Sequence, residues 1–229
     1  GEGFVIGEAL AGDADGLGTG ANDTKEGAAL LRWLHDGMLT QLGHVTRRRD
    51  GSQQGALGVC RKGAKELLAP ASYQRAFAWF DAHGKAAASA APLIVKANVI
   101  SQVHRRVPLD LFLVPHFERG RVAALSVHAG IWTSAALAAA PQDVPRIRAH
   151  LASLAKALGV DSGGHTGKAL VHALTELPHD LLIGFGDADI ERTASAMVSL
   201  VDRPRPKLLL VRAPLERHIF AFVWLPRDA

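Results

Sequence analysis

The C-terminal stretch Lys207–Asp228, KLLLVRAPLERHIFAFVWLPRD, constrains the fold of this chain more than any other segment. It holds two apolar runs, Lys207–Val211 and Ile219–Leu225, separated by a polar turn that contains Pro214, Glu216 and Arg217. Two short apolar runs around a turn of this kind are typical of a β-hairpin. We therefore predict that the chain ends in two paired strands.

The residues before this hairpin extend the pattern. Asp189–Val201 has the apolar spacing of a helix, and Leu181–Phe185 is a short apolar run that favours a strand. Together with the hairpin they predict a βαββ unit over residues 178–229. The sequence begins at Gly1 rather than Met and stops at Ala229 with no further strand, so we expect a segment of a longer protein.

The remaining residues predict three further parts. Residues 1–22 are rich in Gly, Asp and Ala and predict a weakly ordered leader. Residues 23–140 predict an α+β unit, whose strongest feature is a hairpin with strands at Leu111–Val114 and Val122–Val127 and Gly120 in its turn. Residues 141–177 predict a helical connector, since Gly159 and Pro178 follow two helical patterns as stop signals. The fold class is therefore α+β.

The composition excludes several classes of protein. Hydrophobic residues make up 48% of the 229 residues and charged residues 21%, as in globular domains that bury a core. The net charge of +4 comes from scattered basic residues, which argues against a nucleic-acid-binding surface. Cys60 is the only cysteine, so a disulfide framework and a thiolate zinc site are excluded, and a reducing, cytoplasmic compartment fits. No run is long enough to span a membrane and no signal peptide pattern is present.

The sequence contains no complete motif for catalysis, metal binding or nucleotide binding. Gly163–Lys168 lacks the first glycine and the Ser or Thr of a phosphate loop, and Gly16–Gly20 lacks the strand that precedes a dinucleotide loop. The eleven histidines match no compact metal-ligand spacing, and there is no Gly-x-Ser-x-Gly elbow. We therefore predict no catalytic residue, no metal site and no bound cofactor within these residues.

One ligand site remains as a prediction from the residues. Gly184 and Gly186 lie between the run Leu181–Phe185 and the helix expected to begin near Asp187. Free N–H groups at a helix start attract carboxylates, and glycine allows a ligand to approach the backbone. A small amino acid could bind there, although Asp187 and Asp189 already bring negative charge to that end, and a plain turn explains the same residues.

Four collinear stretches of the sequence resemble one known family, the large bacterial NAD-dependent glutamate dehydrogenases. The likeness covers roughly residues 28–228. Its stretches are Leu30–Gly43, similar to "LRWL…FTFLGY"; Lys96–Asn98 with Val103–Arg105 and Asp110, similar to "KAN…VHR…D" and continuing to Ile131–Ala136; His165–Asp180, similar to "HDGKALLEILETYPRDE"; and Val223–Asp228, similar to "VYVPRDRY".

The resemblance implies the N-terminal regulatory region of such an enzyme, with a PAS-like unit, helices and an ACT-like βαββ unit. It also implies a homo-oligomeric parent that converts L-glutamate to 2-oxoglutarate with NAD, whose catalytic and NAD-binding parts do not map onto this chain. His104, Asp110 and Arg227 fall within or beside the matching stretches and are candidates for structural or interface roles. The main hypothesis is a non-catalytic regulatory and assembly segment, and the alternatives are a stand-alone small-molecule sensor and an enzyme whose site is not visible in the sequence.

Overall fold

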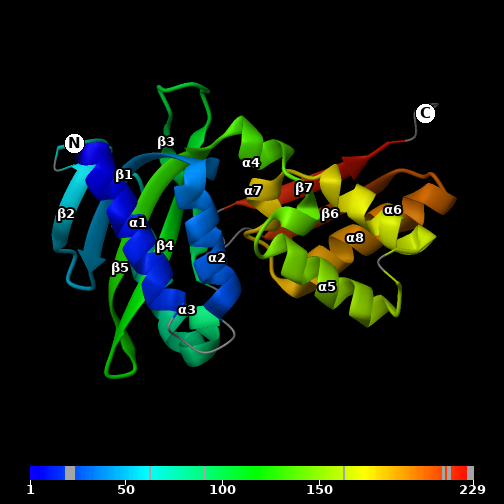
Figure 1. Ribbon diagram of the computed structural model, residues 1–229, viewed down its shortest axis with the longest axis horizontal. Coiled ribbons are helices and arrows are strands. Elements are labelled where there is room, and N and C mark those ends of the chain that lie inside the picture. Colours follow the sequence, from blue (N-terminus) through cyan, green and yellow to red (C-terminus); the bar gives the residue numbers. More distant parts are fainter. Residues whose placement is uncertain are drawn as a thin grey trace. The chain divides into compact units, whose positions relative to one another are not determined.

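The computed structural model describes residues 1–18, 24–61, 63–89, 91–161, 163–212, 215 and 218–225. The chain divides into two compact units, Gly1–Ala136 and Leu137–Ala229, drawn in Figure 1. Both contain helices, and each has a sheet of its own, so the predicted α+β class is confirmed.

The first unit is built around a five-stranded antiparallel sheet with strand order β2-β1-β5-β4-β3. Its elements are α1 (Glu2–Gly18), α2 (Lys25–Trp33), the π-helical turn η2 (Leu34–Met38), β1 (Leu39–Arg48), β2 (Gln53–Gly58), α3 (Pro70–Ser89), β3 (Leu93–Ile100), β4 (Pro108–Glu118), β5 (Arg121–Trp132) and the start of α4 (Ser134–Ala138). The central strands β4 and β5 are buried along most of their length, which places the core of this unit at the middle of the sheet.

The β4–β5 hairpin is the feature that the sequence predicts best. Glu118 pairs with Arg121, so the turn consists of Arg119 and Gly120, both with positive φ. Two-residue turns of this kind match the twist of the paired strands, and glycine adopts positive φ at no steric cost. The predicted hairpin is confirmed.

Helices α1 and α2 pack against each other, and α1 also contacts β1 (Figure 1). The prediction of a weakly ordered leader over residues 1–22 is wrong for residues 2–18, which form α1. Ile6, Leu10, Ala14 and Leu17 recur every three or four residues on this helix and are buried. Burial of this apolar stripe offsets the low helix propensity of the glycines, because tertiary packing supplies most of the stability of a helix in a protein.

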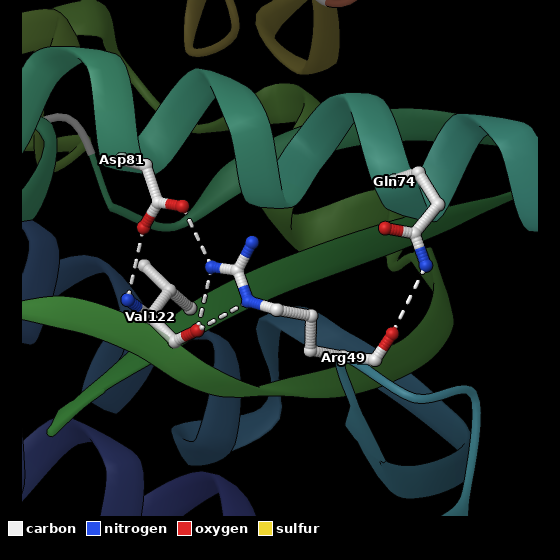
Figure 2. A network of polar contacts seen from close by, with 4 residues as sticks. All are labelled: Arg49, Gln74, Asp81 and Val122. Atoms are coloured by element: carbon white, nitrogen blue, oxygen red, sulfur yellow. Dashed lines mark hydrogen bonds and ion pairs between the residues drawn. The ribbon is translucent and has the colours of Figure 1, made fainter.

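A polar clasp fastens α3 to the sheet (Figure 2). The guanidinium of Arg49, just beyond β1, lies 2.7 Å from a carboxylate oxygen of Asp81 and donates to the carbonyl of Val122 at 2.8 Å. Asp81 also accepts from the Val122 N–H at 3.0 Å, and Gln74 donates to the Arg49 carbonyl at 3.0 Å. These contacts join α3 to Arg49, just after β1, and to Val122, at the start of β5. We therefore interpret the clasp as structural.

The second unit is mostly helical and ends in a two-stranded sheet. Its elements are the 3-10 turn η3 (Pro141–Asp143), α5 (Ile147–Leu158), α6 (His165–Thr175), α7 (His179–Leu182), α8 (Asp187–Asp202), β6 (Lys207–Arg212) and β7 (Ile219–Trp224). Gly159 ends α5 in the left-handed conformation, as predicted. The predicted strand at Leu181–Phe185 is wrong, because α7 and the turn after it occupy these residues.

The C-terminal hairpin is confirmed for β6 and β7, while Pro214, Glu216 and Arg217 of its turn lie outside the described residues. The inner face of the hairpin packs on the helical part of the same unit. The ring of Phe185 lies 6.0 Å from that of Phe220 and 6.1 Å from that of Phe222, and Lys207 donates to the Ser199 hydroxyl at 3.1 Å. Aromatic contacts at these separations hold the sheet to the residues before α8.

Candidate functional site

Asp110 is the centre of a buried polar group in the first unit. It lies on β4, where it pairs with Lys96 of β3 on one side and with Gly130 of β5 on the other. The ammonium of Lys96 is 2.7 Å from one carboxylate oxygen and 3.0 Å from the other, and the indole N–H of Trp132 donates to the carboxylate at 2.9 Å. The Asp110 side chain is only 3% exposed, so this pair joins three strands inside the protein.

The structure places His104 apart from that buried group. His104 has a positive φ of 56° and lies in the exposed loop between β3 and β4. Its neighbour Arg105 reaches back instead, and its guanidinium donates to the carbonyl of Trp132. The sequence stretches that carry the family likeness therefore meet at Asp110 and Trp132, while the structural role expected of His104 stays a prediction.

The two glycines predicted to bind a ligand lie at a helix start, although no strand leads to them. Gly186 is the N-cap of α8, and a Cβ added there would meet no atom within 4 Å. Gly184 lies in the turn after α7, where its N–H donates to the Leu181 carbonyl. The ligand site at Gly184 and Gly186 stays a prediction, and Arg227 lies outside the described residues.

A second polar cluster joins α1 to the middle of the sheet. Asp13 of α1 accepts from Nε2 of His128 on β5 at 2.6 Å, and Nε2 of His116 on β4 lies 3.3 Å from its other oxygen. The ring of His128 stacks on that of His44, its direct partner on β1, with 4.7 Å between ring centroids. Asp13, His44 and His128 are all buried.

This cluster does not have the geometry of an activated nucleophile. The hydroxyl of Ser126 lies 2.7 Å from Nε2 of His116, the same nitrogen that faces Asp13. In a catalytic triad the carboxylate accepts from one ring nitrogen and so orients the imidazole, while the other nitrogen is left to take the proton of the hydroxyl. Ser126 is also 3% exposed, which keeps substrate away. Within the described residues, no group of three or more His, Cys, Asp or Glu side chains is placed to hold a metal ion.

The electrostatics of the cluster follow from burial and from its hydrogen bonds. Burial, together with the neighbouring His128, lowers the pKa of His44 from 6.5 to about 4. Burial alone would raise the pKa of Asp13, but hydrogen bonds from His116 and His128 hold it well below its ordinary value. The hydrogen bond to Asp13 in turn raises the pKa of His116, against the effect of burial. The cluster therefore keeps His44 neutral beside an ionised Asp13.

We expect His44 to make the first unit sensitive to mild acid. Its pKa is about 4 in the folded chain and 6.5 as a free side chain, so the unfolded state binds more protons between these values. The stability held above pH 6.5 is lost as the pH falls toward 4, by on the order of 3 kcal/mol. Urea unfolding of the chain and of His44→Phe at several pH values between about 7 and about 4.5 measures this loss.

His44→Phe keeps a ring against His128 and removes the titrating group, so its stability should fall less over the same pH range. His116 has the opposite effect on the pH dependence of stability, because its pKa is raised in the folded chain. The pKa of Asp13 lies below the pH range of this experiment. Parallel pH profiles for the two proteins would assign the acid sensitivity to another group.

An exposed apolar face on the C-terminal hairpin is the main surface feature of the second unit. Side chains of β6 and β7 alternate, so one row packs inward and the other points away from the helices. The outward row and the residue after β7 include five large apolar side chains that are more than half exposed: Leu208 (61%), Leu210 (53%), Ile219 (64%), Val223 (62%) and Leu225 (71%). The same row also holds Ala221 and the charged, exposed Arg212. Leu208 pairs with Val223 across the strands, so these side chains are contiguous. Contiguous apolar surface of this kind marks an interaction site.

Comparison with known proteins shows what the chain is similar to. Residues 144–203 match the model of the family described as glutamate dehydrogenase, helical motif 1, and this range contains α5 to α8. Two curated relatives match nearly the whole chain. NAD-specific glutamate dehydrogenase of Pseudomonas aeruginosa is 28% identical over 91% of this chain, and that of Halomonas elongata is 24% identical over 90%. The chain is similar to a part of NAD-specific glutamate dehydrogenase.

The predicted resemblance to this family is thus confirmed. The chain spans about 13% of the length of each of these two relatives. Its predicted place at the N-terminus of the parent and its regulatory role stay predictions. None of the helices in the part of the chain that the structure describes combines the length and the apolarity needed to cross a bilayer.

Sequence reasoning missed the cluster around Asp13. It assigned Asp13 to a loose leader and set the histidines aside because their spacing matches no metal motif. The signal lies in the strand register: His44 pairs with His128, and Ser126 lies two residues beyond Ala124, the partner of His116. Side chains two residues apart on one strand share a face of the sheet. The register would have grouped these residues, but it becomes known only with the structure.

Proposed function

We propose that this chain is a non-catalytic assembly and regulatory segment of a large cytoplasmic, homo-oligomeric NAD-dependent glutamate dehydrogenase. The parent would oxidise L-glutamate to 2-oxoglutarate and ammonia with NAD. The observation that carries the proposal is the apolar outer face of the β6–β7 hairpin, at Leu208, Leu210 and Val223. The chain spans about 13% of the length of the similar enzymes. The partner of this face would therefore be another part of the parent protein.

The sheet of the second unit consists of the two strands β6 and β7. A two-stranded hairpin is marginally stable in water without further strands or packing. The inner row of β6 and β7 is packed on Phe185, while the outer row is left in solvent. Burying that row against a neighbouring surface would remove several large apolar side chains from water at about 25 cal/mol per Å². Because this outer row is apolar apart from Arg212, it favours a permanent partner over a transient one.

The chemistry of glutamate oxidation belongs to other parts of the parent under this proposal. Gly16 and Gly18 lie at the end of helix α1, rather than in the strand-to-helix turn that cradles a dinucleotide. Cys60 is buried, which raises the pKa of its thiol to about 12 and makes it a poor nucleophile. Asp110 and Lys96 satisfy each other inside the sheet. We assign these groups structural roles.

A labelling experiment tests the proposal. In the 229-residue chain, Leu210→Cys should react quickly with a water-soluble maleimide, because position 210 is exposed and Cys60 is not reactive. In the full-length parent the same thiol should react at least about tenfold more slowly, since a partner surface excludes the reagent. Peptide mass spectrometry gives both rates, with denatured parent as the reference. Equal rates in the two native proteins would leave the hairpin face without a partner and remove the basis of the assembly role.

A further inference from the structure

A cavity of about 500 Å³ lies between the C-terminal half of α1 and the end of β4. From the described residues, α1 contributes Gly12, Asp13, Gly16 and Leu17 to its wall, and Thr24 follows. The segment Val114–Phe117 of β4 forms the other side. A volume of this size is within the range of small-molecule sites in proteins, which are mainly apolar with a few fixed polar groups.

The wall of α1 is kept open by two glycines one helical turn apart. A Cβ added at Gly12 or at Gly16 would meet no atom of the described residues within 4 Å. Glycine in a helix interior costs about 1 kcal/mol relative to alanine. Among the described residues, nothing packs close enough to require glycine at either position, so the two residues leave space at the cavity that larger side chains would take.

His116 provides the polar group of the cavity. Its Nε2 faces Asp13 at 3.3 Å and Ser126 at 2.7 Å inside the protein, while its side chain is 46% exposed at the cavity. Nδ1, on the other side of the ring, is therefore the nitrogen that remains for a ligand. Asp13 favours the charged imidazole, which carries an N–H on both nitrogens and donates from Nδ1. The apolar side chains of Leu17, Val114 and Phe117 lie around it.

We propose that this cavity is a binding site for a compact, mainly apolar molecule that carries one hydrogen-bond-accepting carboxylate. The carboxylate accepts from Nδ1 of His116, and Asp13 on the far side of the ring balances the imidazolium charge. The apolar body of the molecule lies against Leu17, Val114 and Phe117. A cation is disfavoured because the exposed polar group at the cavity is itself a donor.

Three probes with the same ring test the chemistry of the site. Phenylacetate should bind the 229-residue chain with a Kd on the order of 1 mM, as expected for so small a molecule. Phenylacetamide should bind more weakly, and phenethylammonium weakest of the three. Titration followed by NMR, with the imidazole signals of His116 as the reporter, measures all three affinities. No saturable shift with phenylacetate, or equal affinity for the ammonium probe, would overturn the proposal.

Glycine substitutions give matched variants on one helix. Gly12→Leu with Gly16→Leu should fold, because the added side chains meet open space, and should lose at least about tenfold in affinity for phenylacetate by filling the cavity. Gly3→Leu also meets open space on α1 but lies away from the cavity wall, so it should bind phenylacetate as the unmodified chain does. Unchanged affinity in the filled variant would show that the probe binds elsewhere.

A variant at His116 separates the polar contact from the apolar one. His116→Gln should lower the affinity for phenylacetate about tenfold, because it removes a charged donor, and should change the affinity for phenylacetamide less. Phenylacetate affinity should also fall as the pH rises and His116 loses its proton. The groups that face His116 are Asp13 from α1 and Ser126 from β5, with His128 and His44 behind Asp13. The same loss for both probes would contradict the role of Nδ1.

Discussion

Asp110→Ala should destabilise the chain by about 3 kcal/mol, because it removes the carboxylate that pairs with the largely buried ammonium of Lys96. The Lys96 side chain is 23% exposed, so water compensates only part of the lost pairing. The substitution also leaves the indole N–H of Trp132 without its acceptor. Urea unfolding of the 229-residue chain, with the slope of the transition held as a check on the two-state assumption, measures the change in free energy.

Two further variants make this prediction specific to the buried pair. Asp110→Asn keeps an oxygen that can accept from Trp132 but loses the charge, so its cost should be intermediate. Asp15→Ala removes an ion pair with Arg32 in which the Asp15 side chain is 77% exposed, and it should change stability by less than about 0.5 kcal/mol. A cost for Asp110→Ala no larger than that of Asp15→Ala would show that the buried group contributes little to the fold.

The parts of the fold that depend on local signals were predictable from the sequence. The β4–β5 hairpin follows from Gly120 in a tight turn between two apolar runs, and α5 follows from an apolar stripe that ends at Gly159. The prediction of a strand at Leu181–Phe185 was wrong because a short apolar run fits a strand or a buried helix equally well. Helix α1 was not predicted because its many glycines argue against a helix. Its apolar stripe stabilises the helix only by packing on the rest of the unit.

The polar groups could not be found from the sequence in the same way. Lys96, Asp110 and Trp132 lie on three strands, and only the register of β3, β4 and β5 brings them together. The resemblance to glutamate dehydrogenases pointed to the right stretches without giving their contacts. Asp13 and His128 are 115 positions apart in the sequence, so no spacing rule joins them. Long-range register is the information that was missing.

Charges placed on the apolar face of the β6–β7 hairpin should weaken assembly of the parent protein. Leu208→Lys combined with Val223→Glu places opposite charges directly across the two strands, where such a pair is tolerated or mildly stabilising. The isolated 229-residue chain should therefore keep its stability, since both positions are more than 60% exposed. In the assembled parent the same pair would be taken out of water, at a cost of several kcal/mol. Leu158→Lys, at a 45% exposed position on α5, is the control for adding a charge to the second unit.

Light scattering of the full-length parent carrying Leu208→Lys and Val223→Glu tests the assembly role most directly. We expect a smaller oligomer, or one that dissociates at a protein concentration at least about tenfold higher, with the Leu158→Lys parent unchanged. An assembly of unchanged mass and unchanged concentration dependence would contradict the proposal that this face is held by another part of the parent protein.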